Sequence, residues 1–310
     1  MSTPLKASPL LCIGSVAYDS IITPFGQVNR TLGGSATYFS LASSLFSPTQ
    51  IIAIVGSDFK ELDVFKKREI DISGLQKAQG KTFHWAGKYH FDLNTRETLK
   101  TELGVFDHFK PTLDVKHRAS EYVFLGNIHP RLQLDVLAQI TTPKLVGLDT
   151  MNFWIEKAPR DLVAVMKKID VLVINDSEAR QLSKEHNLVK AARKILKMMG
   201  GQKSDVLIIK QGEHGLLMFH YGSIFNLPGF PLENVVDPTG AGDSFAGGFM
   251  GYLAKTQNLL PANLKTACAY GSVVASFCVE EFGTQRFLTL KKYEVAKRLK
   301  QFKQLTHFHN

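Results

Sequence analysis

Short apolar segments of β-forming residues alternate with amphipathic segments along this chain, and this alternation limits the possible folds more than any other feature. The expected strands are residues 10–16, 50–55, 121–125, 144–148, 170–174, 205–209 and 216–219. The expected helices are residues 35–46, 59–69, 132–139, 160–167, 177–186, 188–199, 241–254, 264–279 and 291–302. Nearly continuous apolar strands between helices predict a three-layer α/β/α fold with a mostly parallel sheet. Ligands bind such sheets beyond the carboxyl ends of the strands.

Two stretches interrupt the alternation, at about residues 20–32 and 82–105. They mix polar and apolar residues with aromatics and threonines, which is typical of strands that have one face in solvent. We expect them to pair as a small β flap, or lid, over a site on a single domain spanning residues 1–310. The second stretch contains Phe83, Trp85, His90 and Arg96, which either cover a sugar or base or pack the flap or a subunit contact.

Composition and charge argue against several classes of partner. The chain is 44% apolar and 21% charged, with a formal net charge of +9. Its basic residues are spread out, and no zinc finger or clear RNA-binding signature occurs, so we expect no nucleic-acid partner. No apolar run is long enough to span a membrane, and the first residues lack a secretory pattern. Together with three cysteines that lack metal-ligand spacing, this predicts a cytoplasmic protein without a membrane partner.

Residues 237–245, which read Asp-Pro-Thr-Gly-Ala-Gly-Asp-Ser-Phe, lie where an apolar strand end meets a helix. Free N–H groups and the positive dipole end of that helix make Gly240, Ala241 and Gly242 a candidate anion site. Asp243 adds a candidate general base, and phosphoryl transfer to a hydroxyl needs both parts. A glycine turn followed by a dipole-complementing Asp is the purely structural alternative.

This run resembles the C-terminal signature of the ribokinase-like (PfkB) carbohydrate kinase family, D-x-x-G-A-G-D-x-F. The resemblance extends from residue 11 to about residue 283. It implies a ribokinase-like fold and an ATP-dependent kinase that transfers the γ-phosphoryl group to a hydroxyl of a sugar or sugar-like molecule. It further implies Asp243 as general base, with ATP and Mg²⁺ in the site.

Other functions stay open or are disfavoured at this point. A nucleoside kinase on the same fold is one alternative, and a catalytically degenerate ligand-binding regulator is another. No G-x-G-x-x-G follows the first strand, which argues against a dinucleotide-dependent oxidoreductase. No G-x-x-x-x-G-K-[ST] occurs either, which argues against a P-loop kinase.

Two segments are candidates for the nucleotide side. Asn175 and Glu178 open an expected helix, where they form either a capping box or the family's N-x-x-E motif, with Glu178 holding Mg²⁺ through water. Residues 210–215 resemble the family's G-x-x-G nucleotide-side turn, with Gly212 and Gly215 as its glycines. A hairpin turn without a ligand explains that segment equally well. Lys210 is a candidate phosphate contact.

The acceptor side is expected near the N-terminus. Asp19, after the first strand, and the pair Gly33 and Gly34 match residues that bind acceptor hydroxyls in the family. An ionised carboxylate such as that of Asp19 can accept hydrogen bonds from two vicinal hydroxyls. The alternative is that Asp19 is a turn residue without a ligand. Ala17 and Tyr38 replace two asparagines of ribokinases. These replacements argue against ribose and favour a bulkier or flatter acceptor that stacks on Tyr38.

Further site residues are expected at strand ends and beside the anion site. Asn127 follows one strand, and Asp149 and Asn152 follow the next, so all three are acceptor-site candidates. Asp237 and Thr239, together with residues 281–284, lie where family members hold a monovalent cation such as K⁺. The resemblance also implies a possible homodimer through the lid.

Overall fold

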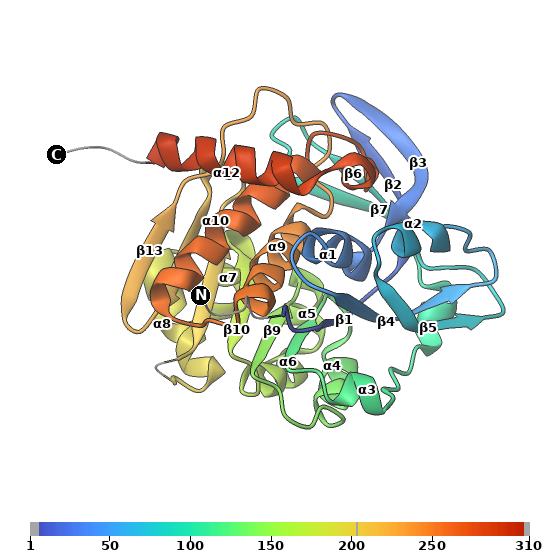
Figure 1. Cartoon of the computed structure of the whole chain (residues 1–310), viewed down its shortest axis with the longest axis horizontal. Helices are drawn as coiled ribbons and strands as arrows, with labels where there is room; N and C mark the ends of the chain where they lie inside the picture. Colours follow the sequence, from blue (N-terminus) through green and yellow to red (C-terminus); the bar gives the residue numbers. More distant parts are fainter. Residues whose placement is uncertain (1–5, 203, 307–310) are drawn as a thin grey trace.

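The core of the molecule is a large, mostly parallel sheet. The computed structural model describes residues 6–202 and 204–306. Within those residues a nine-stranded sheet has the order β13-β12-β11-β10-β9-β8-β1-β4-β5 (Figure 1). The strands from β11 to β5 in that order are parallel, and β12 and β13 extend the sheet as antiparallel hairpin strands. Their bounds are β1 Leu10–Ile13, β4 Thr49–Gly56, β5 Asp71–Ala78, β8 Tyr122–Leu125, β9 Leu145–Asp149, β10 Val171–Asn175, β11 Val206–Lys210, β12 Leu216–His220 and β13 Ser223–Leu227.

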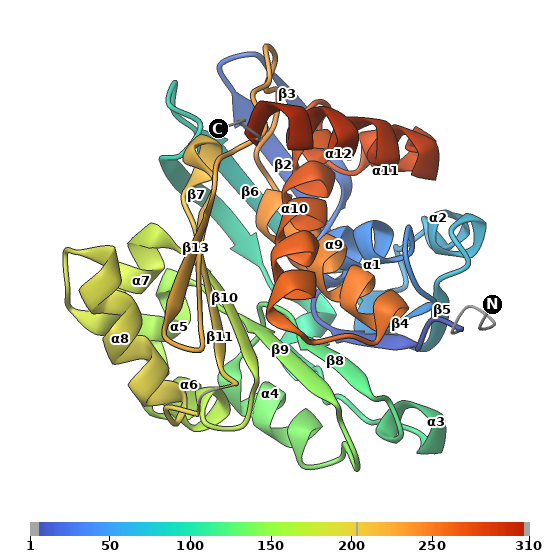
Figure 2. The same ribbon diagram turned by 60° about the vertical axis from the view of Figure 1, so that its left-hand side comes forward.

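Alternate residues of each strand pack into two separate apolar clusters, one on each face of the sheet. In β1, Leu10 and Cys12 belong to one cluster, and Leu11 and Ile13 belong to the other. Helices cover both clusters, which gives the three layers seen in Figure 2. The first face carries α1 Ser35–Ser43, α2 Leu62–Lys67, α9 Ala241–Thr256, α10 Pro261–Cys278, α11 Gln285–Thr289 and α12 Lys292–Thr306; the second carries α4 Pro130–Leu137, α5 Asn152–Lys157, α6 Pro159–Met166, α7 Asp176–Ser183 and α8 Leu188–Met199. The short helix α3 spans Val115–Arg118, and 3₁₀ turns cover Gly104–His108 and Gly212–His214.

A second, four-stranded sheet has the order β3-β2-β6-β7. Its strands are β2 Ala17–Thr23, β3 Gly26–Gly33, β6 His84–Tyr89 and β7 Arg96–Glu102. Two hairpins, β2–β3 and β6–β7, join through parallel pairing of β2 with β6. The prediction that the two interrupting stretches pair as a small sheet is therefore confirmed. We call this sheet the lid sheet.

The three-layer fold is confirmed, and each expected helix and strand has a counterpart. Two strands were missed, β5 and β13, because both lie at sheet edges and lack continuous apolar residues. The first strand is shorter than expected: it ends at Ile13, and not at Val16, because the lid sheet begins only four residues later, at Ala17. Asp19 follows the first strand as expected and lies inside β2. None of the described helices is long and apolar enough to cross a membrane.

Candidate active site

The start of α9 has the geometry of an anion site. Gly240 is the residue before the helix and has φ 74°, a left-handed conformation that favours glycine. The N–H of Ala241 donates to Pro238 O, whereas those of Gly242 and Asp243 have no acceptor among the described residues. Asp243 Oδ1 is buried and likewise has no partner in the described part of the chain. Free donors and an unsatisfied carboxylate oxygen thus lie side by side in the first turn of a sixteen-residue helix.

Lys210 reaches this turn from the end of β11, and the Asn175–Glu178 segment begins at the end of the neighbouring strand β10. Asn175 ends β10, Lys210 ends β11, and the two residues are paired in register. A Cβ atom added to Gly242 would lie 2.6 Å from Lys210 Nζ, so the ammonium group rests directly against the α9 turn. Among the described residues, no carboxylate lies within ion-pair distance of Lys210. The structure therefore leaves a lysine cation in the candidate phosphate site.

The capping box expected for Asn175 and Glu178 is present. Asn175 Oδ1 accepts from the Glu178 N–H, and Glu178 Oε2 accepts from the Asn175 N–H, both at 2.8 Å. Glu178 is nevertheless 6% exposed, which is unusual for a capping carboxylate on a helix surface. The capping bonds fix the position of the Glu178 side chain. Whether Glu178 also binds a metal stays a prediction.

Three buried carboxylates around Lys210 share an unusual electrostatic environment. Burial raises the pKa of Asp243, the Asp149 carboxylate raises it further, and Lys210 opposes the rise. The pKa of Glu178 is raised by burial and then by Asp149, again against Lys210. The pKa of Asp149 is raised by burial, with Lys210 as the main opposing charge. A carboxylate with a raised pKa is a stronger base than a free Asp side chain, which suits proton abstraction by Asp243.

The acceptor-side candidates Asp19, Gly33 and Gly34 lie together at the junction of β2, β3 and α1. Asp19 is 4% exposed, and its carboxylate lies where a Cβ atom on Gly33 would be. Gly34, with φ 94°, precedes α1, and a Cβ atom there would lie 2.5 Å from Ser15 O. Burial raises the pKa of Asp19 to about 7, with a further contribution from Asp237. This cluster holds a carboxylate close to the α9 turn.

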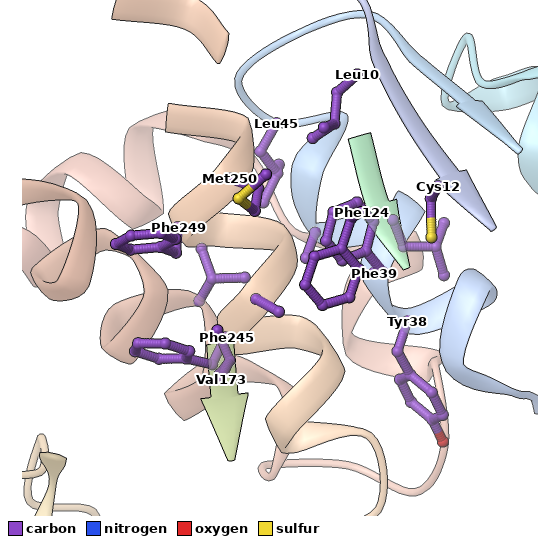
Figure 3. Packing of buried hydrophobic residues seen from close by; sticks show 14 of the residues in the cluster. Leu10, Cys12, Tyr38, Phe39, Leu45, Phe124, Val173, Phe245, Phe249 and Met250 are labelled. Atoms are coloured by element: carbon purple, nitrogen blue, oxygen red, sulfur yellow. The ribbon is translucent and has the colours of Figure 1, made fainter. Parts of the chain in front are cut away.

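Tyr38 does not have the open position that stacking on an acceptor requires. Its side chain is buried at 1% exposure, and a Cβ atom on Gly240 would lie 2.3 Å from Tyr38 Cγ. The ring therefore packs against the α9 turn (Figure 3), and the stacking role expected for it is wrong. Its hydroxyl is buried without a hydrogen-bond partner in the described residues, so only this group remains as a substrate contact.

Asp237 and Thr239 organise the loop before α9. Asp237 Oδ1 accepts from the Thr239 N–H, and Oδ2 accepts from the Gly283 N–H, both at 2.8 Å. Thr239 Oγ1 donates to the Tyr89 hydroxyl of β6 at 3.1 Å. These bonds bring together the two segments expected to surround a monovalent cation, and they tie the lid sheet to the α9 turn.

The remaining acceptor candidates are engaged with protein partners. Asn127 Oδ1 accepts from Trp154 Nε1 at 2.9 Å, and its Nδ2 lies 3.1 Å from Met151 Sδ. Asn152 Nδ2 donates to Gln181 Oε1 at 2.5 Å. Of the three candidates at strand ends, only Asp149 interacts with the α9 turn, since its charge raises the pKa of Asp243.

The described residues do not form a metal site by themselves. No group of three or more His, Cys, Asp or Glu side chains among them is arranged to hold a metal ion. This agrees with the chemistry of Mg²⁺, which usually keeps several waters and binds proteins through one or two carboxylates and substrate phosphates. The buried Glu178 carboxylate, which interacts electrostatically with Lys210, fits such a ligand.

Comparison with known proteins places this geometry in a family. The model of the pfkB family carbohydrate kinases matches residues 8–291. The chain belongs to the PfkB family. It is an ATP-dependent sugar or nucleoside kinase, and the family implies a divalent metal and a small-molecule acceptor with a hydroxyl group.

Curated relatives of this PfkB kinase include two archaeal enzymes. It is 30% identical over 249 residues to a cytidine kinase of Thermococcus kodakarensis, covering 78% of this chain and 87% of the relative. It is 40% identical over 309 residues to a nucleoside kinase of Methanothermobacter thermautotrophicus, covering 89% and 91%. Among solved structures, the nucleoside kinase of Methanocaldococcus jannaschii matches with a TM-score of 0.75 at 21% identity, covering 96% of this chain and 99% of that one. The last comparison supports the ribokinase fold.

Two residues that support the site of this PfkB kinase were missed from the sequence. Tyr89 binds Thr239 and could have been found by its alternation with Trp85 along one strand face. Gln133 is buried in α4 and its amide donates to Gly126 O at 2.9 Å and Asp149 O at 3.4 Å, which joins the ends of β8 and β9. Glutamine is usually exposed on helices, so the sequence carried no signal for Gln133.

Proposed function

We propose that this PfkB kinase is a nucleoside kinase that transfers the γ-phosphoryl group of ATP to a ribose hydroxyl of its acceptor. The position of Trp85 carries the proposal. Asp19 of β2 and Trp85 of β6 are direct cross-strand partners, and such partners point to the same face of a sheet. Tyr89, four residues further along β6 and on the same face as Trp85, accepts from Thr239 beside the α9 turn, so Trp85 faces the side of the lid sheet toward that turn. A carboxylate for hydroxyls next to a flat indole suits a ribose that carries a base.

The contacts of Trp85 support its use as a platform. A Cβ atom on Gly87 would lie 2.1 Å from Trp85 Cη2, so the indole lies along β6 over this glycine. Its Nε1 donates to Thr98 Oγ1 of β7 at 3.4 Å. The side chain is half-buried, in contrast to the fully buried Tyr38. The similarity to a cytidine kinase and a nucleoside kinase agrees with a base-bearing acceptor.

In the proposed reaction, Asp19 accepts hydrogen bonds from acceptor hydroxyls. Asp243 Oδ1 takes the proton of the attacking hydroxyl as the new O–P bond forms and the bond from the γ-phosphorus to the bridging oxygen breaks. The free N–H groups of Gly242 and Asp243 and the Lys210 ammonium stabilise the negative charge on the transferring group. The Tyr38 hydroxyl, Asn127, Gly33 and Gly34 complete the acceptor side, and Gly212 and Gly215 form the turn on the nucleotide side.

We propose Mg²⁺ as the divalent metal, held through water by Glu178, with Asn175 keeping Glu178 in place. When bound, it would neutralise phosphate charge. Asp237 and Thr239 are proposed to hold a monovalent cation such as K⁺. The single-domain organisation, a homodimer through the lid, a cytoplasmic location and the lack of nucleic-acid and membrane partners stay predictions of the sequence.

Trp85→Ala tests the nucleoside assignment. ATP consumption is measured with cytidine, uridine, adenosine and inosine and, in parallel, with free ribose and fructose. Because stacking of a base on an aromatic ring contributes about 1–3 kcal/mol, we expect KM for the preferred nucleoside to rise about tenfold or more. Trp85→Phe, which keeps an aromatic face, should retain most of the affinity, and KM for ATP should not change. Preference for a free sugar, with KM insensitive to Trp85→Ala, would identify a sugar kinase instead.

A further inference from the structure

The tip of the β6–β7 hairpin crosses from the acceptor side to the turn between β11 and β12. Asn94 Nδ2 donates to Glu213 Oε2 at 2.9 Å, although the two residues are 119 positions apart. A Cβ atom on Gly212 would lie 2.6 Å from Asn94 Oδ1, so the amide packs on the backbone of that turn. Figure 2 shows the hairpin beside it. The lid sheet therefore touches the nucleotide-side turn directly.

The hairpin tip is built to present Asn94. Asp92 Oδ1 accepts from the N–H groups of Asn94 and Thr95, at 3.2 and 2.9 Å, and Asp92 Oδ2 accepts from Thr95 Oγ1 at 2.6 Å. The N–H of Leu93 donates to His90 O, and the N–H of His90 donates to Thr95 O, both at 3.0 Å. This local network fixes the turn, so the contact with Glu213 ties the tip of the hairpin to the turn between β11 and β12.

The same hairpin carries an arginine on the face toward the site. Arg96 is paired in register with Tyr89, whose hydroxyl accepts from Thr239 next to the α9 turn. Its guanidinium lies 5.4 Å from the centre of the Trp85 ring, and in the described residues no carboxylate lies within ion-pair distance of it.

Two carboxylates in the site are nevertheless sensitive to this cation. Burial raises the pKa of Asp19 and of Asp243, and the Arg96 charge opposes the rise in both cases. The Arg96 side chain is exposed and lies beside Trp85 on the strand face toward the site, so it can reach a phosphoryl group bound there.

We propose that Arg96 is a further catalytic residue that contacts the transferring phosphoryl group, and that the Asn94–Glu213 contact positions it there. The planar guanidinium can donate two hydrogen bonds to phosphoryl oxygens from the lid, opposite the N–H groups of α9. Arg96 stays protonated throughout. The proposal rests on the kinase reaction and holds for a nucleoside or a sugar acceptor.

Kinetics of Arg96 variants test the catalytic role with the acceptor that proves best in the screen above. We expect Arg96→Met to lower kcat about 10²–10³-fold, the usual cost of removing one preorganised donor, with KM for ATP nearly unchanged. Glu97→Ala is the matched control, because Glu97 is adjacent on β7 but points to the opposite face, and it should keep kcat within about twofold. A rise in acceptor KM with unchanged kcat would assign Arg96 to acceptor binding and overturn the proposal.

Variants of the contact itself test the positioning role. Asn94→Ala and Glu213→Ala should each lower kcat about fivefold, and the double variant should be no worse than either single one, since both remove the same hydrogen bond. Glu213→Gln should retain kcat, because its side-chain oxygen still accepts from Asn94. Equal losses in Glu213→Ala and Glu213→Gln, or additive losses in the double variant, would overturn this role.

Hydrogen exchange provides a readout that requires no acceptor. With MgADP bound, the amides of His90 and Leu93 should exchange faster in Glu213→Ala than in wild type or Glu213→Gln. Equal exchange in all three proteins would show that the contact does not hold the hairpin. A failure of the nucleoside assignment would leave this measurement unaffected, so the two proposals fail independently.

Discussion

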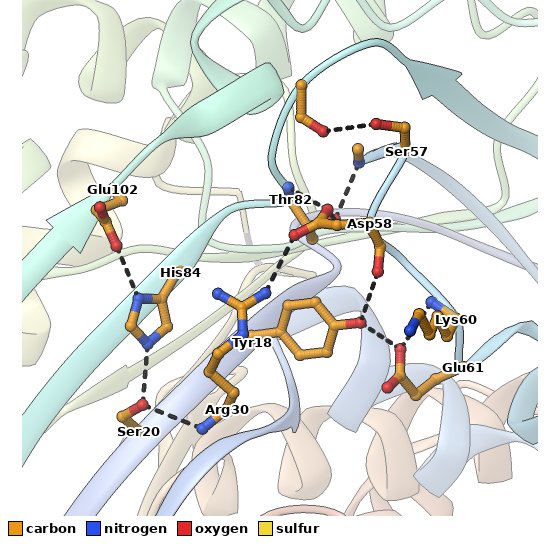
Figure 4. A network of polar contacts seen from close by, with 12 residues as sticks. Tyr18, Ser20, Arg30, Ser57, Asp58, Lys60, Glu61, Thr82, His84 and Glu102 are labelled. Carbon is orange, nitrogen blue, oxygen red and sulfur yellow. Dashed lines mark hydrogen bonds and ion pairs between the residues drawn. The ribbon is translucent and has the colours of Figure 1, made fainter.

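The α9 turn and the lid sheet are held in place by different forces. Along α9, glycines bring neighbouring backbones into contact: a Cβ atom on Gly247 would lie 2.4 Å from Phe39 O, and one on Gly248 would lie 3.0 Å from Gly271 Cα. The lid sheet contributes Tyr18 and Leu32 to the main apolar core, but it also joins the main body through polar contacts between partly exposed side chains, such as Arg30–Asp58 (Figure 4). The proposed base and anion site thus sit on close-packed backbone, and the proposed acceptor contacts sit on a sheet that is attached in part by exposed polar contacts.

Asp243→Asn should produce the largest effect, because it removes the base from the close-packed region without changing its shape. We expect turnover to fall at least about 10²–10⁴-fold, with ATP affinity nearly intact. Steady-state ATP consumption and a separate nucleotide-binding titration measure the two quantities. Turnover like that of wild type would remove Asp243 from its assigned role.

The stability of the same variant provides the control. A carboxyl group whose pKa is raised by folding stabilises the protein below its unfolded pKa, and this contribution is lost as pH rises through the folded pKa. Burial raises the pKa of Asp243, so wild type loses stability from this group between about pH 4 and neutral or mildly alkaline pH. Asn cannot ionise. The Tm of Asp243→Asn relative to wild type should therefore increase from pH 5 to pH 8, and a constant difference would contradict the raised pKa.

Gly240→Ala should have the next largest effect, and Gly222→Ala offers a matched control. Their φ angles are +74° and +73°, but a Cβ atom would meet the Tyr38 ring at 2.3 Å in the first and nothing within 4 Å in the second. Both variants bear the left-handed strain of about 1–2 kcal/mol. Gly240→Ala adds overpacking of about 1–3 kcal/mol and displaces the N–H groups of the turn.

Urea unfolding and turnover measure these two costs. We expect Gly240→Ala to be less stable than Gly222→Ala by that overpacking and to lose at least about tenfold in kcat, while Gly222→Ala stays fully active. Equal stability of the two variants would mean that the Tyr38 ring yields easily, and that the α9 turn is less rigid than its contacts indicate.

The same contrast explains what the sequence could predict. The α9 turn is a local segment in which a phosphate site would require small residues, so Gly240–Asp243 could be proposed in advance as an anion site with a base. The three α/β/α layers could be predicted from the spacing of apolar residues along the expected strands and helices. The lid sheet depends on pairing between distant segments, so the register that sets Trp85 opposite Asp19, and Asn94 against Glu213, had no local signal. The stacking role expected for Tyr38 was wrong for a similar reason, since the burial of its ring depends on Gly240, about two hundred residues away.

Substitutions where the lid sheet joins the main body should have the smallest effects. The two residues of one ion pair, Arg30 and Asp58, can be substituted separately to compare the contacts that each of them makes. Arg30 Nη2 lies 3.1 Å from Asp58 Oδ2, with side chains 42% and 32% exposed, and exposed pairs contribute about 0.2–1 kcal/mol. Asp58 Oδ1 also accepts from both the N–H and the hydroxyl of Thr82, each at 2.7 Å, just before β6. Hydrogen bonds to a charged group are worth about 1.5–3 kcal/mol.

Asp58→Ala should therefore destabilise the protein more than Arg30→Ala, whose cost should stay below about 1 kcal/mol with kcat within about twofold of wild type. Urea unfolding of both variants checks the order. If Arg30→Ala proved the more destabilising, the lid sheet would be attached mainly through β3, where Arg30 also lies 4.5 Å over the Tyr18 ring, and not through the strand that carries Trp85. The expected order places the main polar attachment at Thr82, two residues before β6, so that the strand carrying the proposed acceptor platform also has the stronger polar attachment.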